Sequence, residues 1–269
     1  MIKKSFEILK KNPILILFSL IFELSNVSLN SDLVKKYHTF FSYSALIIIT
    51  FLVLSLMCTA GFNSMIGEAI ISGKTKVSTF LSGIKNFSLR LFLAVLLFGL
   101  FVFGYSITIL ILSFIINTST SNILSIGILI IIIIVLLSTL FLAPLFILWI
   151  PSMILDDIGV IEGLRSGADV AKEAYWILIL SIIVFILPDF IYWLIVFKNL
   201  SFNIQNIQSF NIISQMHTLG FWILKLINIF WNLIFNIFLY VLYKSKTDSS
   251  YSLKNIQNSP QYVDDNNIQ

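Results

Sequence analysis

The stretch TFLSGIKNFSLRLF, residues 79–92, has a near copy at the start of the chain, SFEILKKNPILILF, residues 5–18. Each copy is a short basic amphipathic segment that leads directly into an apolar run of membrane-spanning length. The pattern predicts a repeated unit in which an interfacial helix precedes spanning helices. The matching pairs are Ser5 and Thr79, Phe6 and Phe80, Lys11 and Lys85, Asn12 and Asn86, Leu15 and Leu89, Leu17 and Leu91, and Phe18 and Phe92.

A third, more diverged copy is predicted between Ser152 and Trp176. The tripeptide Ser-Met-Ile closes an apolar run at Ser64 and again at Ser152, and the next apolar run follows at the same distance in both cases, at Phe87 and at Tyr175. The chain is therefore expected to contain a threefold internal repeat. Its units are about residues 1–61, 62–150 and 151–243.

The composition is that of an integral membrane protein. Of the 269 residues, 58% are hydrophobic and 11% are charged, and the mean hydropathy is +0.98. Because a soluble domain carries about 25% charged residues, this chain cannot cover a surface that faces water. Runs such as Ile126 to Ile150 are apolar at nearly every position, without the alternation of a membrane β-barrel. The predicted fold is an all-α polytopic membrane helix bundle.

Six spanning helices with amphipathic interfacial helices are predicted. We expect two short interfacial helices over residues 62–85, because Gly67, Gly73 and Gly83 punctuate this stretch. Residues 244–269 are polar and without pattern, which predicts a disordered cytoplasmic tail after the membrane domain of residues 1–243. The predicted spans are about 13–29, 41–61, 87–116, 123–150, 175–197 and 219–243; residues 117–122 are a connection short enough to make the third and fourth spans an antiparallel hairpin.

Two segments carry helix-start signals. Asn12-Pro13 is typical of an N-cap followed by proline at the first helical position. Asp157 is the predicted N-cap of an interfacial helix that ends near Ala174, with Glu162, Arg165 and Asp169 at ion-pairing spacings. The pair Asp156-Asp157 matches no metal-dependent transferase motif, so the capped helix is the favoured interpretation. The apolar face predicted for this helix consists of Ile161, Leu164, Ala168, Ala171 and Tyr175.

The distribution of Lys and Arg predicts the orientation. Most of them fall on one side of the predicted spans, and only Lys35, Lys36 and Lys198 lie in the loops of the other side. By the positive-inside rule, both termini are expected in the cytoplasm and the protein in the cytoplasmic membrane. The basic residues of the first two units are expected to contact anionic lipid headgroups. They are Lys3, Lys4, Lys10, Lys11, Lys74, Lys76, Lys85 and Arg90.

Three ionisable residues fall inside predicted spans, Glu23, Asp189 and Lys225. Each unpaired charge at mid-bilayer costs about 2.5–3.5 kcal/mol on insertion scales, so mutual neutralisation is expected, foremost between Lys225 and Asp189. These residues indicate either a proton- or ion-coupled site, or a structural ion pair with side chains that snorkel to the outer interface.

The last predicted span carries a polar seam, a row of polar residues at helical spacing: Lys225, Asn228, Asn232, Asn236 and Tyr240. Such a row facing lipid would oppose insertion, so it is expected to face the other helices. It indicates either interhelical hydrogen bonds or the wall of a hydrated or lipid-headgroup pathway.

No catalytic motif, nucleotide-binding loop, metal-ligand cluster or cofactor site is recognised, and nucleic acid is not an expected partner. The lone Cys58 excludes an internal disulfide. The sequence therefore favours a non-enzymatic membrane module that is accessory, regulatory or lipid-interacting, with the anionic bilayer and a membrane protein as candidate partners. The alternative is a small-solute or ion permease that uses the polar seam.

The stretches SFEILKKNP, GEAIISGK, FLSGIKNF and PSMILDDIGVIEGLRSG, read together, resemble a group of prokaryotic six-span membrane proteins. The group includes the YciC-like proteins and the membrane domain fused to some glycerophosphodiester phosphodiesterases. The resemblance extends to about Lys244 and implies a six-helix membrane module. It does not imply phosphodiesterase activity, because the catalytic barrel of the fused enzymes has no counterpart here.

Overall fold

The computed structural model describes residues 1–21, 41–118, 122–199 and 219–257, and these residues form helices and short turns with no strand. The all-helical prediction is confirmed. Residues 14–21 are helical and follow the first helix after a break. The other helices are α1 (Ile2–Lys11), α3 (Phe41–Ser72), α4 (Val77–Thr118), α5 (Asn122–Ile147), α6 (Trp149–Leu155), α7 (Val160–Glu173), α8 (Tyr175–Asn199) and α10 (Leu219–Gln257).

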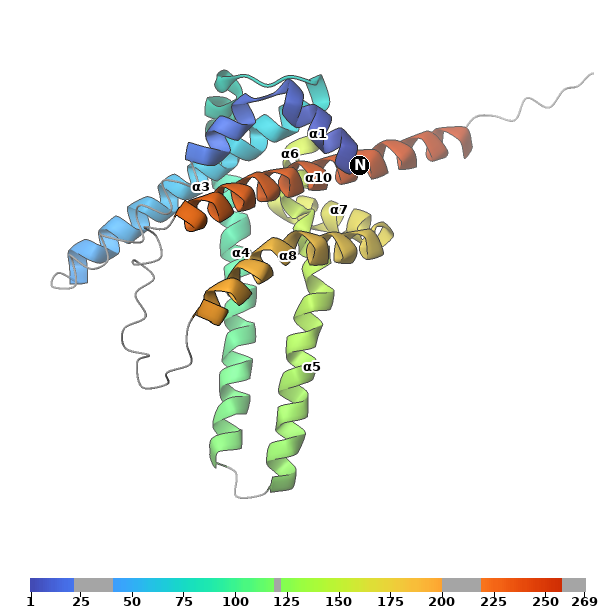
Figure 1. Ribbon diagram of the computed structural model, residues 1–269. Helices are drawn as coiled ribbons and strands as arrows, with labels where there is room; N and C mark the ends of the chain where they lie inside the picture. The colour runs from blue at the N-terminus through green and yellow to red at the C-terminus, as the bar shows by residue number, and fades with distance from the viewer. Residues whose placement is uncertain (22–40, 119–121, 200–218, 258–269) are drawn as a thin grey trace, which may run out of the picture.

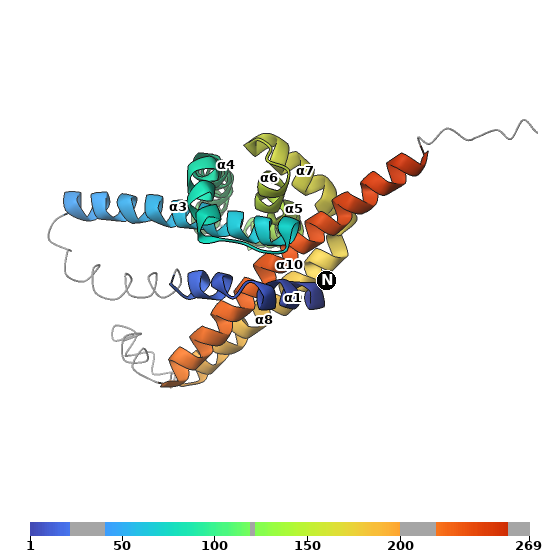
Figure 2. The ribbon, with the colours of Figure 1, turned by 90° about the horizontal axis from the view of Figure 1, so that it is seen from above.

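The molecule consists of a long hairpin and a group of helices gathered at one end of it (Figure 1). α4 and α5 run side by side as the antiparallel hairpin that their short connection predicts. α1, α3, α8 and α10 cross the end of this hairpin, and in the view along the hairpin they fan out around it (Figure 2). Most large apolar side chains of the hairpin between residues 92 and 142 are exposed, as expected for a surface covered by lipid.

α10 is the central element of the packed end. One side of its middle section packs with α1, residues 14–21 and α3, through Ile237, Tyr240 and the buried Met65 and Ile66. Its other side packs with α6, α7 and α8 in a second buried cluster. The helix that carries the polar seam is thus surrounded by protein over much of its length.

Three helices in the described part of the chain are long and apolar enough to cross a membrane, namely Ile49–Ser72, Val77–Ile116 and Lys225–Asp248. A fourth is obtained if α7 and the first part of α8, Tyr175–Pro188, count as one span bent by 92°. The number six stays a prediction. Much of the first predicted span falls within 22–40, outside the described residues.

The two separate interfacial helices expected over residues 62–85 are not present. α3 continues through Gly61 to Ser72, and α4 begins at Val77, so both halves of this stretch belong to long helices. Only Gly73 breaks the chain, with a positive φ of 81° after the helix end. Gly83 does not break a helix. A Cβ at this position would lie 2.4 Å from Cβ of Ser64, so the glycine allows α3 and α4 to approach closely.

The start and the buried face of α7 also differ from the prediction. The N-cap is Gly159, and Asp157 lies before the helix with a φ of 49°. The inward face is made of small residues, among them Gly163, Gly167 and Ala171, whereas Ile161 is 74% exposed. Of the predicted apolar face, Ala171 is buried and Leu164 packs against the cluster of Ala94, Trp149 and Met153, so the prediction is wrong for Ile161 but not for these two residues. Glycine adds to the inward face because the contact with the start of α6 is close: a Cβ on Gly167 would lie 2.8 Å from the backbone oxygen of Leu148.

The chain after Tyr243 does not begin a disordered tail at Lys244. α10 continues to Gln257, and an ion pair between Lys244 and Asp248, 3.2 Å apart, lies along this extension. This pair is at the i, i+4 spacing that supports exposed helices. Residues 258–269 of the predicted tail lie outside the described residues.

Candidate functional site

Asn12 joins the end of α1 to the turn between α3 and α4. Its side-chain amide nitrogen donates to the carbonyl oxygen of Ile8 at 2.9 Å and to that of Gly73 at 3.2 Å, and its side-chain oxygen accepts from the backbone N–H of Thr75 at 2.8 Å. The residue is 3% exposed. Asn12 stands at a helix junction as predicted, but its side chain bonds to this distant turn instead of capping the helix that follows it. We call these contacts the Asn12 clamp.

The turn held by the clamp is fixed from its other side by Glu68. The Glu68 carboxylate accepts hydrogen bonds from the hydroxyls of Thr75, at 3.1 Å, and Thr79. Ser72 donates to the carbonyl oxygen of Lys74 at 2.6 Å. Hydrogen bonds from side chains on three segments therefore hold the turn of residues 73–76 against α1.

The clamp brings together basic residues that the sequence places far apart. Lys11 directly precedes Asn12, and Lys74 lies between the two residues whose backbones Asn12 contacts. We call Lys10, Lys11, Lys74 and Lys76 the basic rim; all four are exposed. The inner side of α1, with Ile8 and Leu9, is buried against the core that includes α10, so its lysines point outward. The other predicted headgroup lysines, Lys3, Lys4 and Lys85, are exposed as well.

Arg90, the eighth residue predicted to contact headgroups, has a protein partner. Its guanidinium lies 2.7 Å from the carboxylate of Asp157 and 5.4 Å from the ring centre of Phe87. The ion pair is partly exposed, with side-chain exposures of 35% for Arg90 and 75% for Asp157, so its contribution to stability is small. Arg90 attaches the turn before α7 to α4.

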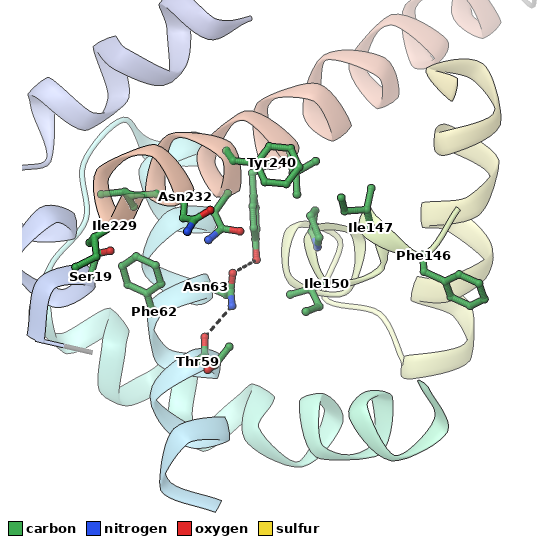
Figure 3. A pocket seen from close by; sticks show the side chains of 15 residues that line it. Ser19, Thr59, Phe62, Asn63, Phe146, Ile147, Ile150, Ile229, Asn232 and Tyr240 are labelled. Carbon is green, nitrogen blue, oxygen red and sulfur yellow. Dashed lines mark hydrogen bonds between the residues drawn. The ribbon is translucent and has the colours of Figure 1, made fainter. Parts of the chain in front are cut away.

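The polar seam of α10 lines a cavity. Asn232, Asn236 and Tyr240 face it, while Asn228 accepts a 2.7 Å hydrogen bond from the side-chain amide of Asn232. The cavity has a volume of about 380 Å³ and lies between residues 14–21, α3, α6 and α10, with the end of α5 at one side (Figure 3). Three of the five seam residues therefore line this cavity, whereas Lys225 and Asn228 are not part of its described lining. That the whole seam faces the other helices stays a prediction.

The polar side of the cavity is completed by residues that were not singled out from the sequence. The Tyr240 hydroxyl donates to the side-chain oxygen of Asn63 at 3.2 Å, and the Asn63 amide donates to the carbonyl oxygen of Thr59 at 2.9 Å (Figure 3). Ser19 adds a hydroxyl from the helical residues 14–21. Thr59 and Asn63 are four residues apart in an apolar run, a spacing that could have marked them. The apolar lining consists of Phe62, Phe146, Ile147, Ile150, Pro151, Ile229, Leu233, Phe235 and Leu239.

Of the three ionisable residues predicted inside spans, the structure describes the side chain of Lys225 alone. Lys225 is half-buried on α10 and is absent from the described lining. Glu23 lies outside the described residues, and so does the side chain of Asp189, whose backbone belongs to α8. The predicted pair of Lys225 and Asp189 stays a prediction.

A separate polar cluster ties α10 to the α6–α7 connection. The hydroxyl of the buried Tyr243 donates to the carboxylate of Asp156 and lies 2.6 Å from the hydroxyl of Ser166. Asp169 pairs with Lys172 at 2.9 Å, not with Arg165. Since Asp156 and Asp157 are engaged by different partners, they do not converge on one point, and no group of three His, Cys, Asp or Glu residues in the described ranges could hold a metal ion.

Comparison with known proteins gives a family without an assigned role. A family model described as a domain of unknown function, DUF7847, matches residues 1–245. No curated protein and no solved structure matches the chain. The matched range includes the basic rim and the whole seam of α10.

Proposed function

The chain belongs to the DUF7847 family, and we propose that this member is a non-enzymatic membrane module that interacts with lipid through its basic rim. The observation that carries the proposal is the Asn12 clamp. It sets Lys10 and Lys11 on the same edge as Lys74 and Lys76, although the two pairs are more than 60 residues apart in sequence.

Electrostatics favours anionic headgroups as the contacts of this edge. Each Lys near an anionic membrane surface contributes about 1 kcal/mol to binding at low screening. Ammonium groups held on a fixed turn lose less freedom on binding than those on a flexible tail, because the backbone is already ordered. The basic rim also lies at the end of the molecule from which the apolar hairpin of α4 and α5 extends away, so its lysines can meet headgroups while the hairpin enters the hydrocarbon.

The proposed orientation puts this rim at the cytoplasmic face of the cytoplasmic membrane, with both termini inside. The excess of Lys and Arg on the side of the rim supports it. In this proposal the three repeat units contribute two spans each, and the module supports or regulates a partner membrane protein. A thiol reagent applied from outside the cell should label a single cysteine substituted for Ser119 and should not label one substituted for Thr75.

Lipid binding by the basic rim is tested with matched charge variants. The purified full chain in nanodiscs is titrated with fluorescent phosphatidylglycerol at low salt. Lys11→Gln with Lys74→Gln should weaken binding on the order of tenfold. The control, Arg165→Gln with Lys172→Gln, removes the same charge from α7 and should change binding less than twofold. An equal loss of affinity in the two variants would show that binding depends on net charge and not on the basic rim, which would contradict the proposal.

The second candidate is a small-solute permease, and the observation that favours it is the polar side of the cavity. A neutral solute that passes between the helices could form hydrogen bonds with Asn63, Asn232 and Asn236. An ion permease is less well supported, because none of the described lining residues is charged. Solute flux into liposomes that contain the purified protein, abolished by Asn236→Leu, would establish this alternative.

A further inference from the structure

We infer that the cavity beside α10 is a binding site for the uncharged head of an amphiphile, a hydroxyl- or ester-bearing group on a hydrocarbon chain. The inference rests on the proposed lipid-interacting function and names a second lipid site, distinct from the basic rim. It follows from three properties of the cavity: its unused hydrogen-bonding groups, its lack of charge, and its connection to the apolar surface.

The cavity offers both donors and acceptors. The Asn236 side chain has no hydrogen-bond partner in the described ranges, so its N–H groups and its oxygen are available. The side-chain nitrogen of Asn232, which also lines the cavity, donates to Asn228, and its side-chain oxygen accepts no hydrogen bond in the described ranges. The Tyr240 hydroxyl donates its hydrogen to Asn63, and its oxygen can still accept a hydrogen bond. Asn236 is an exposed residue that lines the cavity, so a ligand in the cavity can reach its amide and form hydrogen bonds with it.

The ligand head must be neutral. The described lining contains no Asp, Glu, Lys, Arg or His. A phosphate or ammonium group in this cavity would therefore lose its hydration without meeting an opposite charge. Hydroxyl, amide and ester groups lose far less, and they match the donors and acceptors of Asn232 and Asn236. This property separates the cavity from the basic rim, which favours anionic headgroups.

The apolar lining of the cavity is continuous with the hairpin surface through Phe146. Phe146 lines the cavity and also packs against two rings of α4, with ring centres 5.9 Å from Phe98 and 5.5 Å from Phe101. Both α4 rings are 45% exposed on the hairpin surface. A head held at Asn236 can thus continue as a chain that passes Phe146 and joins the lipid around α4 and α5. The volume of about 380 Å³ is at the lower end for ligand pockets, which suits a head with the first part of a chain.

The test uses photoreactive lipids on the purified full chain in nanodiscs. Diacylglycerol and phosphatidic acid with the same diazirine-bearing chain differ only in the phosphate. We expect saturable labelling by the diacylglycerol probe, with adducts at Phe146, Phe98 or Phe101, at least tenfold above the phosphatidic acid probe. Competition by unlabelled diacylglycerol but not by dodecanol identifies a bilayer glyceride as the source; competition by dodecanol identifies a free long-chain alcohol.

Asn236→Leu is the decisive variant, because it replaces the amide with an apolar group of similar size. It should lower the saturable labelling at least tenfold and leave the midpoint of thermal unfolding in lipid-free detergent nearly unchanged, because Asn236 is exposed and makes no hydrogen bond in the described ranges. The control Asn86→Leu, an exposed residue of α4 away from the cavity, should leave labelling unchanged.

Equal labelling by the charged and neutral probes, or unchanged labelling of Asn236→Leu, would overturn the cavity assignment. The phosphatidylglycerol titration of the same Asn236→Leu protein keeps the two proposals apart. If the cavity assignment fails while anionic binding still depends on Lys11 and Lys74, the lipid-interacting function stands without the neutral site. If that dependence also fails, the lipid-interacting function fails with it.

Discussion

The first two copies of the repeated stretch carry the same asparagine and use it in opposite ways. Asn12 is buried at a break between two helices and holds a turn some 60 residues away in the sequence. Asn86, its counterpart, lies exposed within the uninterrupted α4. The next residue differs: Pro13 follows Asn12, whereas Phe87 follows Asn86.

Proline accounts for this difference. It has no N–H to donate and it disfavours the helical conformation of the residue before it. Asn12 accordingly has φ −130° and ψ 66°, outside the helical region, which turns its side chain toward Gly73 and Thr75. In the second copy the helix continues, and the asparagine stays on its surface. The copy with proline after the asparagine thus ends its amphipathic helix there, and the copy without proline continues into a spanning helix.

The largest effect is expected where the copies differ in side-chain size. Leu9 is buried in the core, while its counterpart Gly83 allows α3 to approach α4. Gly83→Leu, which makes the second copy like the first, should destabilise the protein by about 3 kcal/mol or prevent folding. Thermal unfolding in detergent measures this. Gly99→Leu is the control, because nothing lies within 4 Å of its added Cβ, and an equal loss in both variants would show that the close approach of α3 and α4 is not needed.

A smaller but selective effect is expected at the two asparagines. Asn12→Ala removes three hydrogen bonds and leaves the N–H of Thr75 without its partner, at a cost of about 1–3 kcal/mol. Asn86→Ala should stay within about 0.5 kcal/mol of the original protein. Unfolding midpoints of the two variants measure the difference directly. Similar midpoints would mean that the clamp does not contribute to stability.

The smallest effect is expected for the proline itself. Pro13→Phe gives the first copy the residue of the second and should destabilise by about 0.4–1 kcal/mol, because the unfolded chain gains freedom. Amide hydrogen exchange should accelerate at Thr75, whose N–H bonds to Asn12. Unchanged exchange at Thr75 would show that the break at Asn12 persists without proline.

The sequence predicted those features that depend on local composition. The starts of α8 at Tyr175 and α10 at Leu219 agree with the prediction, because apolar runs begin there after polar segments. Asn232, Asn236 and Tyr240, which the spacing places on one face of a helix, line one cavity. Gly67 and Gly83 were misinterpreted as helix breaks, because the sequence does not distinguish a glycine that breaks a helix from one that allows close packing.

The long-range features were beyond the reach of spacing arguments. The contact of Asn12 with Gly73 depends on where α1 packs against α10, which no local pattern encodes. The same holds for the partner of Arg90: Asp157 is close only because α6 and α7 fold back on α4. Asn63 joins the cavity for a similar reason, through its hydrogen bond with Tyr240 across two helices.

The clamp is tested most directly by a disulfide between its two sides. In a Cys58→Ala background, Asn12→Cys with Thr75→Cys should form a disulfide on mild oxidation, because the Asn12 side chain lies 2.8 Å from the backbone nitrogen of Thr75. The counterpart pair, Asn86→Cys with Thr75→Cys, should not form one. Asn86 lies roughly 14 Å along α4 from the start of that helix at Val77, because an α-helix rises about 1.5 Å per residue, and a disulfide needs Cα atoms within about 7 Å. Mass spectrometry of the oxidised protein measures both. A disulfide in the first pair alone is the predicted result; failure of the first pair, or equal yields in the two pairs, would contradict the account.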